Sequence, residues 1–356
     1  MNQLSNKSIL LTALNWGIGH AARCVPLIHA LQVEGAELSI GSDGKAKEFL
    51  QKEFPNIEIL EMPANEIRYG KKGVAAALLP QLPAFFKQIS GDQRWVKELV
   101  AKKNIDLIIS DNRYGCHHDT VPSVLITHQL NIQASKLAKP MIDKVLKSWV
   151  NNFNEIWVPD IEEGLAGVLT KSKLNIPVRF LGPLSRFSST KSKRTNHSSE
   201  KQLLVLLSGP EPQRSILEAK IWNQLSPLNM SVVFVRGTNS TFELTKLSHV
   251  KVYDLLTADK LNPIFEQSKY IICRSGYSTL MDLAQQECQA LLIPTPGQSE
   301  QEYLAKYCQE QNWTVSETQS DFNINKFLQL DHNQCFPQIP TTIKQWVYQV
   351  SQITNF

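Results

Sequence analysis

The chain has 356 residues, of which 42% are hydrophobic and 20% are charged, and its formal net charge is +4. This length suits two domains of ordinary size, and the composition is typical of a soluble globular protein. So small a net charge gives no reason to expect a nucleic-acid partner, and no apolar run approaches the ~20 residues that would span a bilayer.

Apolar runs alternate with helical stretches along the whole chain, which predicts parallel strands that are covered on both faces. Repeated strand–helix units imply right-handed crossovers, so we predict an α/β fold with two doubly wound, Rossmann-like domains. The predicted strands of the first half are 8–14, 37–40, 57–60, 105–110, 123–127, 155–158 and 178–181. Those of the second half are 203–207, 232–235, 250–253, 270–273 and 290–293.

A polar stretch rich in serine, threonine and lysine marks the boundary between the two halves. We predict a first domain over 1–183, a linker over 184–201 and a second domain over 202–340. Residues 341–356 have helix-like apolar spacing, which would let a last helix pack back onto the first domain.

The cysteines and the start of the chain bear on its compartment. The six cysteines are scattered and form no Cys-x-x-Cys pair, which favours reduced thiols over a disulfide framework or a zinc site. The first residues lead directly into a predicted strand, without the charged and apolar segments of a signal peptide. We therefore expect a cytoplasmic protein.

A glycine-containing loop joins the first predicted strand to a helix predicted over 21–31. Gly17 and Gly19 would let the backbone approach a ligand closely, and His20 lies in the first helical turn. A histidine there could act as a general base on a hydroxyl, although a helix-capping role is the alternative. Because Ala22 replaces the third glycine of Gly-x-Gly-x-x-Gly, the loop does not favour a nicotinamide cofactor.

Polar residues follow two further strands of the first half. Asp111 and Asn112 come after one strand, and His128 and Gln129 come after the next. Since ligands bind at the carboxyl ends of strands in doubly wound sheets, we expect these residues to contact an acceptor, with ordinary loop residues as the alternative. No Asp-x-Asp triplet and no metal-ligand spacing occurs, so we expect neither a metal ion nor a cofactor.

The strongest signal in the chain follows the strand predicted over 270–273. That strand breaks at Ser275-Gly276 and we predict a helix that includes 283–286, so free backbone N–H groups would attract phosphate. Arg274 would add a positive charge, and the carboxylate of Asp282 could accept hydrogen bonds from ribose hydroxyls. These residues indicate a site for a nucleoside diphosphate.

Two further loops of the second half could complete this site. Ser208, Gly209 and Arg214 follow the first strand there and could hold the diphosphate from the opposite side. Glu300 and Gln301 follow the last strong strand and could bind sugar hydroxyls. A plain tight turn and an ordinary helix start are the alternatives.

An apolar stretch over 73–86, preceded by two lysines, could form a surface for a lipid acceptor or for membrane contact. A core helix is the alternative.

The order of these motifs resembles the GT-B glycosyltransferases, and most of all the MurG-like family, glycosyltransferase family 28. The run 15–23 also looks like that of uncharacterised bacterial glycosyltransferases of this group. The resemblance implies two Rossmann-like domains facing across a cleft, the first binding the acceptor and the second binding the nucleotide sugar. It rests on Gly19-His20, on the turn 182–186 that ends in Arg186, on 273–276 with Thr279 and Asp282, and on Gln301.

The same resemblance implies a role for each of these positions. His20 corresponds to the candidate base, and Arg186 lies near the donor phosphate. Asp282, where the family usually has glutamate, corresponds to the residue that binds the ribose, and Gln301 to the glutamine that contacts the donor sugar. The sequence departs from the family at Ala305, which replaces an asparagine, in a first loop with fewer glycines, and around His128, where the acceptor element lacks its glutamate.

We therefore expect an inverting, metal-independent glycosyltransferase that moves a sugar from a UDP-sugar to an acceptor hydroxyl. UDP-N-acetylglucosamine is a candidate donor, and a lipid-linked or cell-envelope glycan is a candidate acceptor. Peripheral contact with the inner face of the membrane stays open. The alternatives are a UDP-sugar 2-epimerase on the same architecture and a non-catalytic subunit that binds nucleotide sugars.

Overall fold

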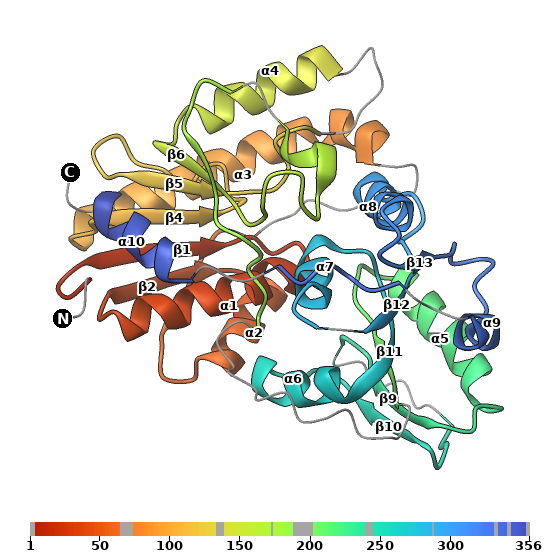
Figure 1. Cartoon of the computed structure of the whole chain (residues 1–356). Helices are drawn as coiled ribbons and strands as arrows, with labels where there is room; N and C mark the ends of the chain where they lie inside the picture. Colours follow the sequence, from red (N-terminus) through yellow and green to blue (C-terminus); the bar gives the residue numbers. More distant parts are fainter. Residues whose placement is uncertain are drawn as a thin grey trace. The chain divides into compact units, whose positions relative to one another are not determined.

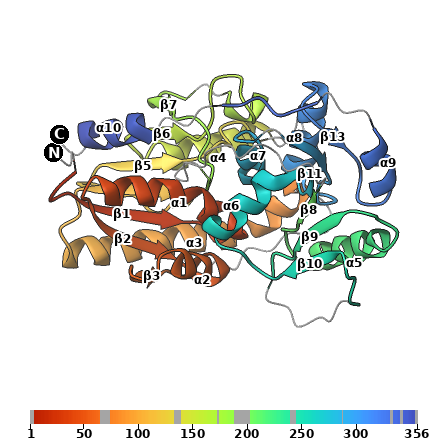
Figure 2. The same cartoon turned by 60° about the horizontal axis from the view of Figure 1, so that its bottom comes forward.

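The computed structural model describes residues 4–64, 74–132, 139–171, 174–187, 202–238, 245–286, 288–330, 334–339 and 343–353, with the backbone alone at 74–82 and 343–344. The chain divides into two compact units. Unit 1 comprises Met1–Ser189 and Pro340–Phe356, and unit 2 comprises Thr190–Ile339. Figure 1 and Figure 2 show the helices and strands of the two units.

Within the described residues, the strands of unit 1 form one parallel seven-stranded sheet in the order β3-β2-β1-β4-β5-β6-β7. These strands are β1 (Ser8–Ala13), β2 (Glu37–Ser42), β3 (Ile59–Glu61), β4 (Leu107–Asp111), β5 (Ser123–Ile126), β6 (Glu155–Val158) and β7 (Val178–Phe180). The helices are α1 (Ile18–Val33), α2 (Gly44–Glu53), α3 (Val74–Lys102), α4 (Lys139–Val150) and α10 (Ile343–Ile353), with a 3-10 turn over Gly167–Thr170.

Helices cover both faces of this sheet, which is why its strands are apolar on both sides. On one face, α1 contacts both α2 and α10, and the views in Figure 1 and Figure 2 both show α10 alongside α1. On the other face, Val96 of α3 packs with Leu10 of β1 and Ile108 of β4. The buried indole of Trp346 in α10 donates a hydrogen bond to the carbonyl of Leu181 at 2.5 Å, which ties the end of the chain to the end of β7.

Unit 2 repeats the same arrangement. Its described strands form a parallel six-stranded sheet in the order β10-β9-β8-β11-β12-β13, and its core includes Val205, Ile221 and Phe327. The strands are β8 (Gln202–Leu206), β9 (Ser231–Val235), β10 (Val250–Tyr253), β11 (Ser268–Cys273), β12 (Gln289–Leu292) and β13 (Val315–Ser316). The helices are α5 (Gln213–Leu225), α6 (Ala258–Gln267), α7 (Tyr277–Leu283), α8 (Ser299–Glu310) and α9 (Ile324–Gln329).

The order of strands reverses once in each sheet, and this position is where ligands bind in doubly wound folds. In unit 1 the reversal lies between β1 and β4, where Ala13 pairs with Asp111. In unit 2 it lies between β8 and β11, where Leu206 pairs with Cys273. The loops that leave these four strands are therefore the first places to look for a site.

The predicted α/β fold with two doubly wound sheets is confirmed, and every predicted strand is present with ends shifted by a few residues at most. The two-residue strand β13 was not predicted. The helix predicted to include 283–286 was wrong, because α7 ends at Leu283. There the N–H groups of Gln285 and Gln286 bond to carbonyls three residues back, which closes a tighter turn and ends the helix.

In the part of the chain that the structure describes, no helix combines the length and apolar character needed to cross a membrane.

Candidate functional site

The loop after β1 carries the predicted glycines and His20. Gly17 caps α1 with φ of 78°, a left-handed conformation that suits glycine, and a side chain there would meet open space. The helix begins at Ile18, three residues earlier than predicted, so Gly19 and His20 both lie in its first turn. A larger residue at this cap would therefore be strained by its backbone conformation rather than by crowding.

His20 is paired with Asp111, which ends β4 on the neighbouring strand. Its Nδ1 lies 2.6 Å from Asp111 Oδ1, and the His20 side chain is 14% exposed while the Asp111 side chain is fully buried. Burial alone would raise the pKa of Asp111, but Arg23 and His20 outweigh it and lower this pKa to about 2. The carboxylate is thus ionised and can only accept, so His20 Nδ1–H donates. Because burial lowers the pKa of His20, its Nε2 is unprotonated at neutral pH. An imidazole in this tautomer is a base that is ready to accept a proton at Nε2.

Arg23, one turn further along α1, was not recognised in the sequence. It is 1% exposed and binds Asp111 with two hydrogen bonds, Nε to Oδ2 at 2.5 Å and Nη2 to Oδ1 at 2.6 Å. Its third nitrogen, Nη1, lies 3.3 Å from His128 Nδ1. The structure therefore brings together three predicted site residues, His20, Asp111 and His128, through an arginine that was not predicted.

A second buried arginine, Arg113, lies in the loop after β4 and binds carboxylates from two other segments. It bonds Asp43 at 2.6 Å and Asp92 at 2.7 Å, and Asp43 accepts a hydrogen bond from Asn15 at 3.2 Å. Its neighbour Asn112 has a left-handed backbone with φ of 56° and is 7% exposed, and its Oδ1 has no partner among the described residues. Arg113 thus holds the loop after β4 in place through its two ion pairs. The side-chain oxygen of Asn112, which follows Asp111 in the chain, is an acceptor that no described residue uses.

Aromatic side chains adjoin the β1 loop. Trp16 packs edge-on against Phe85 of α3 with ring centroids 5.9 Å apart, and Phe85 stacks on Trp149 of α4 at 6.3 Å. Phe86, which is 50% exposed, and Tyr114 also contact Trp149. Phe85 and Phe86 belong to the predicted apolar stretch, whose residues up to 73 lie outside the described residues, while Trp149 was not predicted.

In unit 2, Arg274 follows β11 as predicted, but its side chain is buried and makes no exposed positive surface. Its Nη1 and Nη2 donate to the carbonyls of Ile293, Pro294 and Gln213 at 2.9–3.1 Å, and Nη2 also donates to Gln319 Oε1 at 2.6 Å. Burial lowers the pKa of Arg274 to about 10, so it stays charged at neutral pH. All four partners are neutral oxygens, and no carboxylate compensates the charge in these contacts.

Two buried polar atoms near Arg274 lack a partner among the described residues. They are Arg274 Nε and Thr295 Oγ1, the latter on the loop after β12. Gly209, after β8, has φ of 106°, and a Cβ added to it would lie 3.5 Å from Thr295 Oγ1 and 3.9 Å from Arg274 Nε. Two unused donors near a bare backbone position are what an oxygen-rich anion requires.

Gln301 is fixed next to these atoms. Its Oε1 accepts from the N–H of Thr295 at 2.9 Å, and its carbonyl accepts from Ser275 Oγ at 2.8 Å. A Cβ on Gly276 would lie 4.0 Å from Gln301 Nε2, so the amide N–H₂ of Gln301 is presented to the loop after β11. Ser275 and Gln301, which the sequence assigned separately to the donor site, thus lie together.

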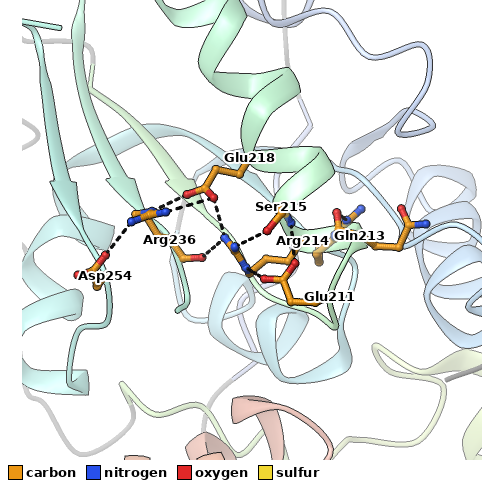
Figure 3. Close-up of polar contacts among 8 residues, drawn as sticks. Glu211, Gln213, Arg214, Ser215, Glu218, Arg236 and Asp254 are labelled. Atoms are coloured by element: carbon orange, nitrogen blue, oxygen red, sulfur yellow. Dashed lines mark hydrogen bonds and ion pairs between the residues drawn. The ribbon is translucent and has the colours of Figure 1, made fainter. Parts of the chain in front are cut away.

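Arg214 is engaged in an ionic network that the sequence did not predict (Figure 3). It bonds Glu211 at 2.5 Å and Glu218 at 3.0 Å, and Glu218 also bonds Arg236 at 2.5 Å. Arg236 in turn pairs with Asp254 at 3.2 Å. Because carboxylates already neutralise it, Arg214 has less charge to offer a diphosphate than we expected.

The remaining predicted residues have definite places. Asp282 and Thr279 lie on α7 and are 1% and 8% exposed, and Ser208 lies in the loop after β8. The remaining three are Arg186, which lies over the ring of Phe187 at 5.7 Å, Gln129, whose N–H donates to Thr127 Oγ1, and Glu300 in the first turn of α8. The described residues gather no group of three histidine, cysteine or carboxylate side chains suited to a metal ion.

Comparison with known proteins gives the enzyme class. The Glycosyltransferase family 28 C-terminal domain matches residues 213–334. Two relatives from Methanosarcina acetivorans and Methanosarcina mazei, both described as uncharacterized glycosyltransferases, are 24% and 22% identical over 327 residues, which cover 86% of this chain and 84% of each relative. Both organisms are archaea, so the expected closeness to bacterial members is not confirmed.

Solved structures with the same fold include the glycotransferase of kitacinnamycin, with a TM-score of 0.64 and 13% identity over 99% of this chain and 94% of that one. Acinetobacter baumannii MurG aligns with a TM-score of 0.53 and 14% identity over 97% and 99% of the two chains. Spinosyn rhamnosyltransferase SpnG, complexed with thymidine diphosphate, aligns with a TM-score of 0.58 and 12% identity over 98% and 96%. The predicted enzyme class, glycosyltransferase, is therefore confirmed, on a GT-B fold whose residues 213–334 match the C-terminal domain of family 28.

Proposed function

We propose that the protein transfers a sugar from a nucleoside diphosphate sugar to an acceptor hydroxyl, by direct displacement with inversion and without a catalytic metal ion. The observation that carries this proposal is the pair of unused donors beside Gly209. Arg274 Nε and Thr295 Oγ1 are buried, and both lie within 4 Å of the position that a Cβ on Gly209 would take. A phosphate oxygen that packed against the bare Cα of Gly209 would have both donors near it, and its negative charge would compensate the buried guanidinium.

The donor would be held by the loops after β8, β11 and β12. The diphosphate would lie beside Gly209, with Ser208 and the loop at Gly276 on either side. The amide of Gln301 would reach the donor sugar, and Asp282 would accept from the ribose hydroxyls, as the MurG-like resemblance implies. UDP is the proposed nucleotide and UDP-N-acetylglucosamine the first candidate donor, with thymidine diphosphate, which SpnG binds, as the comparison ligand.

His20 would act as the base in unit 1. Its unprotonated Nε2 would take the proton of the acceptor hydroxyl while that oxygen forms its bond to the anomeric carbon. The bond from the anomeric carbon to the diphosphate would break in the same step, and its electron pair would leave with the nucleoside diphosphate. Arg274 and Thr295 would stabilise the charge that develops on this leaving group, a contribution that typically amounts to 10²-fold or more in rate.

The acceptor is proposed to carry an apolar part. Trp16 lies in the loop that precedes α1, four residues before His20, and its ring begins the chain of contacts through Phe85 to Trp149. A lipid or a ring-bearing alcohol would gain free energy by covering exposed carbon at Phe86. A lipid-linked acceptor would bring the protein to the cytoplasmic face of a membrane as a peripheral enzyme.

The variant His20→Ala tests the base. We expect it to abolish glycosyl transfer, assayed by mass spectrometry with UDP-N-acetylglucosamine, other nucleotide sugars and a panel of phenolic and lipid acceptors, while calorimetric UDP binding survives. Equal loss of both activities would remove the base role. Incubation with UDP-N-acetylglucosamine alone separates this proposal from an epimerase, which would form UDP-N-acetylmannosamine without any acceptor.

A further inference from the structure

The buried guanidinium of Arg23 links two polar side chains near His20, those of Asp111 and His128. It forms a two-pronged pair with Asp111 from β4 and a third contact, at 3.3 Å, with His128 after β5. Cys24 on the same helix lies with its Sγ 3.6 Å from Asp111 Oδ2. Since Arg23 is 88 residues from Asp111 and 105 from His128, it joins three distant segments at one point.

The chemistry of arginine fixes the direction of each hydrogen bond in this group. A guanidinium can donate but cannot accept, so His128 Nδ1 must be the acceptor of the bond from Arg23 Nη1. Asp111 is ionised and accepts from both Arg23 and His20. The only tautomer of His20 that satisfies this arrangement has its proton on Nδ1, and the base nitrogen, Nε2, is left bare.

The charges near His20 also affect whether its imidazole is protonated. Among the described residues, the charged and titratable groups that act on His20 are Asp111, Arg23 and His128, and the thiol of Cys24 and the phenol of Tyr114 lie near Asp111 and Arg23. A buried carboxylate on its own would favour the imidazolium form of its partner histidine. Burial lowers the pKa of His20 below its ordinary value of 6.5, and the charge of Arg23 lowers it further against the pull of Asp111.

We propose that Arg23 is a positioning residue of the transfer site, which clamps Asp111 so that His20 is held in its base tautomer and unprotonated. This proposal rests on the proposed function only for its kinetic consequence. The clamp itself is a property of unit 1 and can be measured without any substrate. The competing explanation is that Arg23 is a structural brace, as Arg113 is between Asp43 and Asp92.

Arg113 offers a matched control because it is equally buried, at 1% exposed, and bonds two carboxylates without contacting His20. The test compares Arg23→Gln, Arg23→Lys and Arg113→Gln by NMR titration of the His20 imidazole in the full-length protein. The signal is assigned through its loss in His20→Asn. Thermal unfolding of each variant is recorded in parallel, and the pH dependence of kcat follows once an acceptor is found.

In Arg23→Gln the cation is lost and Asp111 remains, so we expect the pKa of His20 to rise by about one unit or more. The acid limb of the kcat profile should shift upward by the same amount. In Arg113→Gln the protein should lose stability while the His20 titration stays in place. If Arg23→Gln lowers the stability of the protein but leaves the pKa of His20 at its wild-type value, the proposal is overturned.

Arg23→Lys decides the case where Arg23→Gln does not fold. Lysine keeps the positive charge of arginine but lacks the planar guanidinium that binds Asp111 at two points. The pKa of His20 should therefore stay low, while the NMR resonances of His128 should shift. The value of kcat should fall by about tenfold or more, because a misplaced base costs rate. If Arg23→Lys has the same resonances and the same kcat as the wild type, the proposed positioning role of Arg23 is overturned. Absence of transfer with every acceptor, together with the expected titrations, would refute the proposed function and leave the clamp standing.

Discussion

Replacing Thr295 by valine should make the protein more stable and the donor site weaker at the same time. The Thr295 hydroxyl is buried, the residue is 3% exposed, and its Oγ1 has no partner among the described residues. A buried hydroxyl without a partner costs about 1–3 kcal/mol, and valine replaces it with a methyl group of similar size. We therefore expect Thr295→Val to gain about 1 kcal/mol in the free energy of unfolding, or roughly 2–4 °C in Tm.

The same change removes a donor that we assign to the diphosphate. A hydrogen bond to a charged group is worth about 1.5–3 kcal/mol, so the affinity for UDP should fall by roughly 10- to 150-fold. Urea unfolding and titration calorimetry measure the two effects on the same sample.

Thr314→Val is the matched control for this experiment. Thr314 is also buried in unit 2, but its Oγ1 donates to the carbonyl of Ala290 at 2.7 Å. Its removal should cost about 1 kcal/mol of stability and leave UDP binding in place. A Thr295→Val protein that is less stable than the wild type and binds UDP equally well would refute the reasoning.

Two further predictions concern the buried ions. Glu218→Gln leaves two buried guanidiniums, Arg214 and Arg236, without their shared carboxylate and should cost about 3–5 kcal/mol in urea unfolding, whereas Asp254→Asn at the exposed end of the network should cost at most about 1 kcal/mol. Equal losses in the two variants would contradict the network. Because the folded pKa of Asp111 lies at about 2, below its ordinary 3.8, its contribution of about 2 kcal/mol is present above pH 4 and is lost as the pH falls toward 2. The difference in unfolding free energy between wild type and Asp111→Asn should shrink over that window, and a constant difference would count against the ionised carboxylate.

Sequence patterns were sufficient for every strand except the two-residue β13, and they pointed to the loops in which we propose the site. Buried parallel strands are continuous apolar runs, and the polar residues that follow β1, β4, β8 and β11 lie at the reversal points of the two sheets. Neither the sequence of β1 nor that of β4 specifies that Ala13 pairs with Asp111. It is this strand register that brings Asp111 next to His20.

Burial was the quantity that the sequence did not reveal. Arg274 was expected to add a positive charge beside the helix start, but its Nη1 donates to backbone carbonyls that follow β12, and among the described residues its Nε has no partner. Thr295 drew no attention because a missing hydrogen bond has no sequence pattern. From the sequence, Arg23 is an ordinary helix residue, because its carboxylate partner, Asp111, lies 88 residues away at the end of β4.

For Arg214 a usable signal was present. Glu218 follows it by four residues, which on a helix places the two side chains on one face, and the structure pairs them at 3.0 Å. An arginine with such a partner is a weaker candidate for phosphate than Arg274, whose hydrogen bonds to the described residues all go to neutral oxygens.

Titration calorimetry of UDP into wild type, Gly209→Ala and Gly35→Ala tests the proposed donor site most directly. Gly209 and Gly35 both have positive φ, 106° and 81°, so alanine strains the backbone at either position. Only at Gly209 would the new methyl group lie beside Thr295 Oγ1 and Arg274 Nε. We predict one UDP site per chain, lost or weakened at least about tenfold in Gly209→Ala and retained in Gly35→Ala. A wild-type protein that binds neither UDP nor thymidine diphosphate, or a Gly209→Ala protein that binds UDP as tightly as the wild type, would contradict it.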